Sequence, residues 1–527
     1  MIILKHKLFI SAALFGALYA PIAAAQTYDG GVDVEELGSA QAYDVGAIDT
    51  GQGALPPTLW NGTSAAVATT LIDAAPSASR SAVVSDMVTR VLLSPGAPPQ
   101  GGENDRDYVN ARLSKLVGLG RSDALDAIFA REPNLARGAS GQRLKADSAL
   151  RAKDANAACL IADGISEGRT QPYWAKLRAF CHVERGEIRA AELTMDLLQQ
   201  SGHEDAAFYA ALMTLTGVKQ PVVIQSSPSA LLELMMAQIE RGAVSDDPLA
   251  KFIADAPALS LVELDKRLTK LAIVPTLVGG QPDTGEFDLD TMGREKNAAS
   301  WGRLYGAVKS STDGAVKAKA ATLLLTRAEK SGIFTPIANL ISPQVETIPP
   351  EVRVQFDPEI WSRLAVREGD LYALRPLYDF IDAGDPFRAR VALASDALGN
   401  GFILGQLGED MTSRVLADDG GQNRAVRDVF IATALGAQLS DPVARRLTDG
   451  EFSMSGRRAP SPQLLALESA AGKGAQAEVA LRASIILGAE GSSALDADSL
   501  SRIIRALYAA GLTEFATRLA AEDFIEP

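Results

Sequence analysis

The sequence has 527 residues, of which 47% are hydrophobic and 6% aromatic, with two cysteines and a net charge of −14. This apolar content is too high for a chain that is disordered throughout, and two cysteines are too few for a small disulfide-rich fold. The excess of acids argues against a dedicated nucleic-acid binder or a protein of anionic membrane surfaces, because both need a basic surface.

Residues 1–25 have the three parts of a secretory signal. Lys5 and Lys7 precede an apolar run, and a row of small residues ends at Ala25. A membrane anchor needs about 20 unbroken apolar residues, and Pro21 interrupts this run, so we expect cleavage after the alanines. Removing the segment, which carries two lysines and no acid, takes the net charge to −16. We therefore predict a protein of the bacterial periplasm that does not span the membrane after cleavage.

Composition divides the rest of the chain into four parts. Residues 26–57 contain six acids and no Lys or Arg, with Gly, Ala and Gln between them, and predict a disordered acidic tether. Residues 275–297 combine Gly, Pro and a cluster of acids and predict a linker. The two long parts, residues 58–274 and 298–527, are then expected to be an N-terminal and a C-terminal helical-repeat block.

The apolar spacing is helical almost throughout these two blocks. The clearest example is the set Leu500, Ile503, Ile504 and Leu507. Positions i, i+3, i+4 and i+7 lie on one face of a helix, which must be buried against a neighbour. Similar spacings begin at Val109 and at Leu231. The sequence therefore predicts an all-α protein.

A pattern of leucine, aspartate and alanine recurs after 31 residues. Leu113, Leu119, Asp123, Ala124 and Ala127 are followed by Leu144, Leu150, Asp154, Ala155 and Ala158. A related turn-and-alanine pattern runs from Leu177 to Ala191. Such units of helix, tight turn and helix resemble tetratricopeptide repeats. The resemblance implies an α-solenoid of helical hairpins, and most of the mature chain is similar to periplasmic helical-repeat proteins of alphaproteobacteria.

Three of the four tryptophans share one context, the pattern Trp, small, basic, Leu. The pattern defines a candidate interaction face: Trp174, Lys176, Trp301, Arg303, Trp361 and Arg363. One interpretation is that each indole wedges between helix layers, with the neighbouring base towards solvent. The other is that the three indoles line one concave surface and bind a ligand or a peptide. The sequence leaves both interpretations open.

Cys159 and Cys181 lie 22 residues apart, on two helices that the repeat pattern makes neighbours and antiparallel. The two thiols then come level across the pair, and in an oxidising compartment we predict a disulfide. It would stabilise the fold by about 3 kcal/mol through its restriction of the unfolded chain. His182 offers one more metal ligand, but a zinc site normally needs four, and the C-x-x-C spacing of redox enzymes is absent.

The sequence contains no recognisable catalytic motif. The mature chain has two histidines, His182 and His203, and the motifs G-x-S-x-G, H-E-x-x-H and G-x-x-x-x-G-K-[ST] are absent. The glycines in residues 472–477 imitate a dinucleotide-binding turn but follow a helical pattern. The acids in residues 283–290 lack the order of a calcium-binding loop. We expect no catalytic, cofactor-binding or metal-binding residue.

These observations favour a protein that binds rather than catalyses. Helical solenoids expose long surfaces that usually bind proteins or peptides. We therefore expect a non-catalytic scaffold with a protein or peptide partner in the cell envelope, in wall remodelling, secretion, surface assembly or motility. The alternative is a glycan-directed enzyme or glycan-binding protein that acts on peptidoglycan or another envelope polysaccharide, since two carboxylates suffice for glycoside hydrolysis. The oligomeric state stays open.

Overall fold

The structure of the protein is a computed structural model. It describes residues 45–527 except 104, 218–228, 244–247, 257–258, 260, 273–276, 279–280, 283–287, 296, 400–408, 418–421, 450–451, 453–454 and 527. The chain divides into two units, residues 1–40 and 41–527, and every described residue belongs to the second. The predicted signal segment 1–25 and most of the predicted tether therefore lie outside the described residues.

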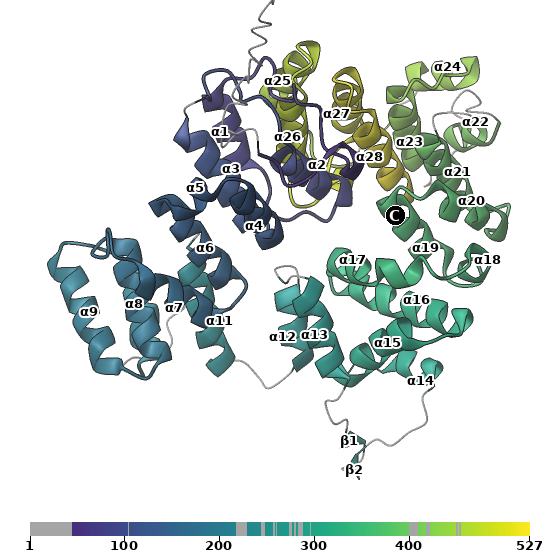
Figure 1. The fold of residues 1–527 in the computed structure, drawn as a ribbon. Helices are drawn as coiled ribbons and strands as arrows, with labels where there is room; N and C mark the ends of the chain where they lie inside the picture. The colour runs from purple at the N-terminus through teal and green to yellow at the C-terminus, as the bar shows by residue number, and fades with distance from the viewer. Residues whose placement is uncertain are drawn as a thin grey trace, which may run out of the picture. The chain divides into compact units, whose positions relative to one another are not determined.

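Helices make up nearly all of the regular structure (Figure 1). The first part contains η1 (Thr50–Gln52), α1 (Ala65–Ala74), α2 (Ala82–Leu93), α3 (Arg106–Gly118), α4 (Ser122–Arg131), α5 (Pro133–Arg137), α6 (Ala139–Arg151), α7 (Ala155–Gly164), α8 (Pro172–Glu184), α9 (Ile188–Gln200), α10 (Ala206–Leu215), α11 (Ala230–Ala243), α12 (Pro248–Asp255) and α13 (Leu261–Leu271).

The second part begins with two short strands, β1 (Leu277–Val278) and β2 (Gln281–Pro282), which pair in antiparallel orientation. It continues with α14 (Leu289–Arg294), α15 (Ala298–Ser310), α16 (Gly314–Lys330), α17 (Phe334–Val345), α18 (Pro350–Arg353), α19 (Pro358–Glu368), α20 (Leu371–Phe380), α21 (Pro386–Leu398), α22 (Glu409–Leu416), α23 (Gln422–Ala434), α24 (Asp441–Asp449), α25 (Ser461–Gly472), α26 (Gln476–Leu487), η4 (Ser492–Ala494), α27 (Ala497–Ala509) and α28 (Thr513–Ile525).

The all-α prediction is confirmed, and the local reasons are visible in the sequence. Many helices begin after an Asp, Ser or Asn whose side chain accepts a hydrogen bond from a backbone N–H of the first turn, as Asp154 does for α7 and Asp496 for α27. Such caps satisfy donors that the helix itself leaves unpaired. The apolar stripe that starts at Leu500 lies in α27, and all four of its residues are buried.

The 31-residue recurrence corresponds to helix–turn–helix units. Its first copy spans α3 and α4, and its second spans α6 and α7, with the short α5 between them. The helices of each unit pack on each other, and α7 packs in turn on α8, and α8 on α9. Figure 1 shows α6, α7, α8 and α9 as a row of neighbouring helices. The described chain is thus built largely from helical hairpins.

Two hydrophobic cores form in the described part of the chain. The smaller core lies within residues 146–239 and includes Trp174, Phe180 and Phe208. We call α6–α11, which surround it, the disulfide lobe. The larger core collects buried residues from both sides of residues 146–239 in the sequence, from Val45 to Leu144 at the centre of α6 and from Phe252 to Ile525.

This arrangement differs from the predicted division at residues 275–297. α13 precedes that segment and packs on α15 and α17, which follow it. Gly302 in α15 permits the close approach, because a Cβ at this position would lie 2.1 Å from the backbone nitrogen of Ala272. Part of the predicted linker is itself a helix, α14, with Leu289 and Met292 buried. The apolar faces on both sides of the polar segment therefore belong to one core.

The predicted tether 26–57 also ends earlier than its composition indicated. Val45 and Leu55 are buried. The backbone N–H of Ala47 donates to the carbonyl of Leu93 at 2.8 Å, and that of Leu55 donates to the Ser94 hydroxyl at 2.8 Å. The acidic composition of residues 26–57 as a whole does not reveal these few apolar residues, which anchor the end of the segment. Residues 45–57 are therefore part of the fold.

Segments from opposite ends of the chain pack together. α1 packs on α26, and α2 packs on both α26 and α28; in Figure 1 the purple α2 lies beside the yellow α26 and α28. α2 buries eight of its twelve residues, and the other four, Ser85, Asp86, Thr89 and Arg90, form a partly exposed polar stripe. We call the contact of residues 45–93 with α26 and α28 the seam.

Candidate functional site

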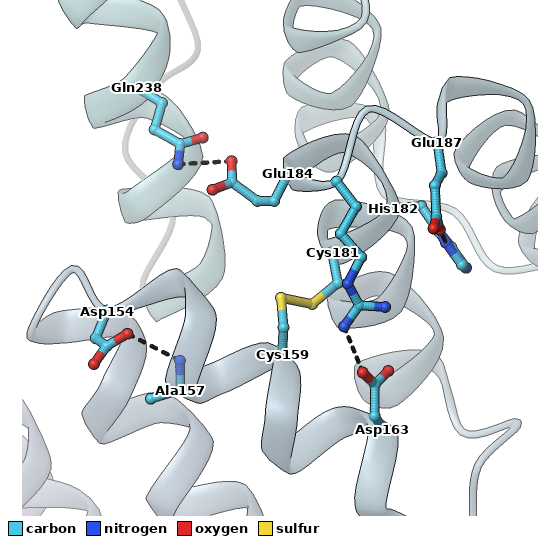
Figure 2. Close-up of a disulfide and its surroundings, with 10 residues drawn as sticks. Asp154, Ala157, Cys159, Asp163, Cys181, His182, Glu184, Glu187 and Gln238 are labelled. Atoms are coloured by element: carbon cyan, nitrogen blue, oxygen red, sulfur yellow. Dashed lines mark hydrogen bonds and ion pairs between the residues drawn. A yellow bond between two sulfur atoms is a disulfide. The ribbon is translucent and has the colours of Figure 1, made fainter.

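The disulfide lobe contains the cysteine pair that the sequence singled out. Cys159 lies on α7 and Cys181 on α8 (Figure 2), and their sulfurs are 1.99 Å apart with a Cα–Cα distance of 5.6 Å. Both residues are buried, with exposed fractions of 4% and 1%. A reactive cysteine needs an exposed, electropositive setting, so this disulfide is structural: it staples one helical hairpin to the next.

Polar contacts within and between helices surround the disulfide. Nδ1 of His182 lies 2.6 Å from a carboxylate oxygen of Glu187, and Gln238 on α11 donates to Glu184 on α8 at 2.9 Å; Figure 2 shows both pairs close to Cys181. Among the described residues, no group of three or more His, Cys, Asp or Glu side chains is arranged to hold a metal ion.

The three tryptophans of the shared motif do not form an exposed face. Trp174, Trp301 and Trp361 are all buried, with exposed fractions of 2–3%. Trp174 lies in the core of the disulfide lobe, whereas the other two lie in the larger core. The indole of Trp361 donates to the Thr322 hydroxyl at 3.0 Å. Of the two interpretations of these residues, this burial favours the one in which each indole wedges between helix layers.

The whole motif can be explained by this packing. The leucine of each copy is buried, as is the small residue after each tryptophan, namely Ala175, Gly302 and Ser362. Only the basic residue points away from the core. Lys176 pairs with Asp205 at 2.5 Å, Arg363 pairs with Glu329 and Glu359, and Arg303 is half-buried. Lys176 and Arg363 thus take part in ion pairs between helices.

Other sequence features have structural roles. Residues 473–475 form the turn between α25 and α26, with helices on both sides where a dinucleotide site needs a strand. Asp288 caps α14, and Asp290 pairs with Lys319 at 2.6 Å. Asp283 and Glu286 lie outside the described residues.

A cleft of about 250 Å³ lies where the disulfide lobe meets the larger core. One wall is formed by α11 together with the end of α6, including Leu150. The other wall is formed by the end of α3 and its turn, Gly118–Gly120, with Ser77 and Leu259. Leucines and small residues make up most of the lining, so that an extended chain can approach closely.

The charged groups of the cleft lie on the side of the lobe. Arg151 pairs with Glu233 at 2.9 Å, and Lys153 pairs with Asp255 at 2.7 Å. Asp255 also accepts from Arg267 at 2.6 Å. Burial alone would raise the pKa of Asp255, but its hydrogen bonds with Lys153 and Arg267 outweigh this effect and lower the pKa. The ion pair of Lys153 with Asp255, together with the hydrogen bond from Arg267 to Asp255, therefore connects the disulfide lobe to the larger core.

Lys153 has an unusual backbone conformation at the edge of this cleft. Its φ is +60°, the only positive φ among the described non-glycine residues. A side chain in this left-handed region is uncommon and often marks a constrained position. Here the turn between α6 and α7 directs Lys153 towards Asp255 on α12. Sequence reasoning missed this residue, because nothing in its local pattern distinguishes it from other turn lysines.

The described residues thus include a cleft lined by apolar and polar groups, with two paired cations at its edge. None of the described helices is both long and apolar enough to cross a membrane. Comparison with protein-family models, with curated proteins and with solved structures finds no match to this chain.

Proposed function

We propose that this protein is a non-catalytic interaction protein of the periplasm that binds a peptide segment of a partner protein in the cell envelope. The binding site is the cleft between α11 and the Gly118–Gly120 turn. The partner takes part in wall remodelling, secretion, surface assembly or motility. The protein belongs to the TPR-like helical-repeat proteins in architecture, and it reaches the periplasm through cleavage of residues 1–25.

The observation that carries this proposal is the chemistry of the cleft. Leu119 and Leu259 supply partly exposed apolar surface, and Arg151 and Lys153 place two cations at the edge, where each is paired with one carboxylate, Glu233 or Asp255. This surface complements a short extended peptide with an apolar side chain followed by a carboxylate. The buried disulfide supports an oxidising compartment, since such bonds persist there.

A variant that fills the cleft with a large side chain tests the proposal directly. Gly118 is the last residue of α3 and lines the cleft, and a Cβ at this position would meet only the Ser77 hydroxyl, at 3.9 Å. Gly118→Phe should therefore place a ring in the cleft without backbone strain. Gly164 is the last residue of α7 and lies outside the cleft, and a Cβ there would meet no neighbouring group within 4 Å. Gly164→Phe is thus the matched control.

The experiment selects peptides on the full mature protein from a random peptide library and then measures their affinity by fluorescence polarisation. We expect the enriched peptides to combine a leucine-like residue with an acid, and Gly118→Phe to weaken their binding more than tenfold while Gly164→Phe leaves it unchanged. Equal binding by the two variants, or a library without enriched peptides, would remove the cleft as the site.

A second candidate function is glycan binding, and one exposed surface favours it. On α20, Tyr372 and Phe380 are 81% and 59% exposed. Aromatic side chains that stand in solvent are typical platforms for sugar rings, and the buried tryptophans cannot serve this role. Binding of peptidoglycan fragments that is lost in Tyr372→Ala, together with no peptide binding, would favour this alternative.

A further inference from the structure

The seam contains a carboxylate in an unusual position. Glu522 on α28 accepts hydrogen bonds from the backbone N–H of Ala82 at 2.8 Å and from the Ser81 hydroxyl at 2.5 Å. These groups begin α2, so a residue 440 positions further along the chain caps this helix. The end of a helix with free N–H groups attracts negative charge. Glu522 therefore connects the first described helices to the last one.

The remaining polar contacts of the seam are of a different kind. Arg90 on α2 makes a two-pronged ion pair with Glu514 on α28 at 2.8 and 2.9 Å, and Arg518 pairs with Asp86 at 2.5 Å. Glu514 is 57% exposed. It has two arginine partners, and these outweigh burial and lower its pKa. Glu514 and Glu522 thus lie on the same helix and in the same seam, but the surroundings lower the pKa of Glu514 and raise that of Glu522.

The charged groups around Glu522 come from three elements. Arg518 on α28 favours its ionised form, while Glu526 just after α28 disfavours it. Arg367 on α19 also interacts with Glu522, and it interacts in turn with Asp86 on α2. Burial outweighs the favourable contacts and raises the pKa of Glu522 to about 7.

We propose that the seam between α2 and α28 is a pH-sensitive contact, and that Glu522 is the group whose protonation tightens it. The geometry accommodates both states of the carboxyl group. When ionised, it accepts from both donors. When protonated, its carbonyl still accepts from the Ala82 N–H, and its own O–H donates to the Ser81 hydroxyl, which can rotate to accept.

The sign of the effect comes from the difference between the closed and the open seam. Released into solvent, Glu522 ionises near pH 4.5, whereas in the closed seam it ionises near pH 7. Between these values the closed form holds a proton that the open form lacks, so a falling pH favours closure. As the pH rises through 7, this stabilisation is lost. Linkage then predicts about a tenfold increase in the opening equilibrium from pH 6 to pH 8.5.

Hydrogen exchange followed by mass spectrometry tests this on the full mature protein. The amides of α2 report opening of the seam, and those of α16 in the larger core correct for the intrinsic dependence of exchange on pH. We expect the corrected exchange of α2 to increase about tenfold from pH 6 to pH 8.5. Glu522→Gln should abolish the increase, because the amide mimics the protonated carboxyl group.

Glu514→Gln is the matched control and should keep the full increase, since Glu514 is ionised throughout this range. A second variant covers the case in which Glu522→Gln fails to fold. Ser81→Ala removes a donor that favours the ionised carboxylate, so the increase should extend to higher pH; a purely structural role of Ser81 would instead raise exchange equally at every pH. A wild-type protein without the increase, or a Glu522→Gln protein that retains it, overturns the proposal.

Discussion

The disulfide lobe and the seam show two different ways of holding helices together. In the lobe, each helix packs mainly on helices that are close in sequence, and a disulfide with a separation of 22 residues ties two hairpins. In the seam, α2 meets helices almost 400 residues or more away. Bringing together segments so far apart in the chain costs more conformational entropy than forming local contacts. In the seam this cost must be offset by the buried apolar residues of α2 and by the paired polar groups.

This difference implies that the disulfide lobe and the seam should unfold independently of each other. Their buried residues form separate cores, and the polar connection between lobe and larger core consists of exposed or half-buried pairs such as Lys153–Asp255. Damage to one core should therefore leave the hydrogen-exchange protection of the other largely intact.

The largest effect is expected from the ion pair that anchors α28. Both Asp523 oxygens accept from Arg427, at 2.6 and 3.0 Å, and the carboxylate is fully buried. Asp523→Ala leaves the arginine charge without its buried partner, which should lower the free energy of unfolding by about 3–5 kcal/mol. Chemical denaturation measures the loss, and hydrogen exchange should increase in α26–α28 but not in α6–α11.

The exposed pair Arg185–Asp163 in the disulfide lobe is the control for this variant. Both of its side chains are about 40% exposed or more, so Asp163→Ala should cost less than about 1 kcal/mol. A double variant with apolar residues at 427 and 523 should recover much of the stability, because it buries no charge. Failure of Asp523→Ala to destabilise would show that α28 is held by apolar packing alone.

The second largest effect concerns the disulfide. Replacement of Cys159 and Cys181 by alanine should destabilise the lobe by about 3 kcal/mol, because the reduced chain gains the freedom of a 22-residue loop. Exchange should increase in α7 and α8 and remain unchanged in α2, and reduction of the wild-type protein should have the same effect. An equal increase in both regions would contradict the independence of the two cores.

The same contrast explains what could be predicted from the sequence. The helical periods of α3 and α27, the hairpins of the lobe and the cysteine pair all depend on spacings within about 35 residues, where helix geometry is fixed at 3.6 residues per turn. The seam has no such rule. The sequence of α2 is apolar except for Ser85, Asp86, Thr89 and Arg90 and indicates a largely buried helix, but nothing near it specifies α28 as its partner.

The candidate site shows the same limit. The pattern of Trp, small residue, base and leucine is real, but it describes a buried packing face, because the small residue and leucine face the core along with the indole. The cleft combines α3, α6, α11 and residues 77 and 259. Its charged edge depends on the left-handed turn at Lys153, which no local signal in the sequence reveals.

A smaller effect is expected where the lobe joins the larger core. Asp255→Asn removes the charge that Lys153 and Arg267 share, and should cost no more than about 1 kcal/mol at pH 6. The pKa of Asp255 is lowered in the fold, so its contribution is present above the unfolded pKa and is lost as the pH falls through the folded value. Thermal unfolding of the two proteins should therefore differ at pH 6 and begin to converge below about pH 4. This is the opposite of the response expected at Glu522.

The smallest effect should come from the surface of the seam. Glu514→Gln weakens the ion pair with Arg90, but Glu514 is 57% exposed, and such pairs contribute about 0.5 kcal/mol, which added salt screens. The difference in melting temperature from wild type should therefore shrink between about 0.05 and 0.5 M NaCl. A seam held mainly by these pairs would open in high salt. Because most residues of α2 are apolar and buried, we expect its amides to stay protected in high salt, which separates the contribution of burial from that of surface charge.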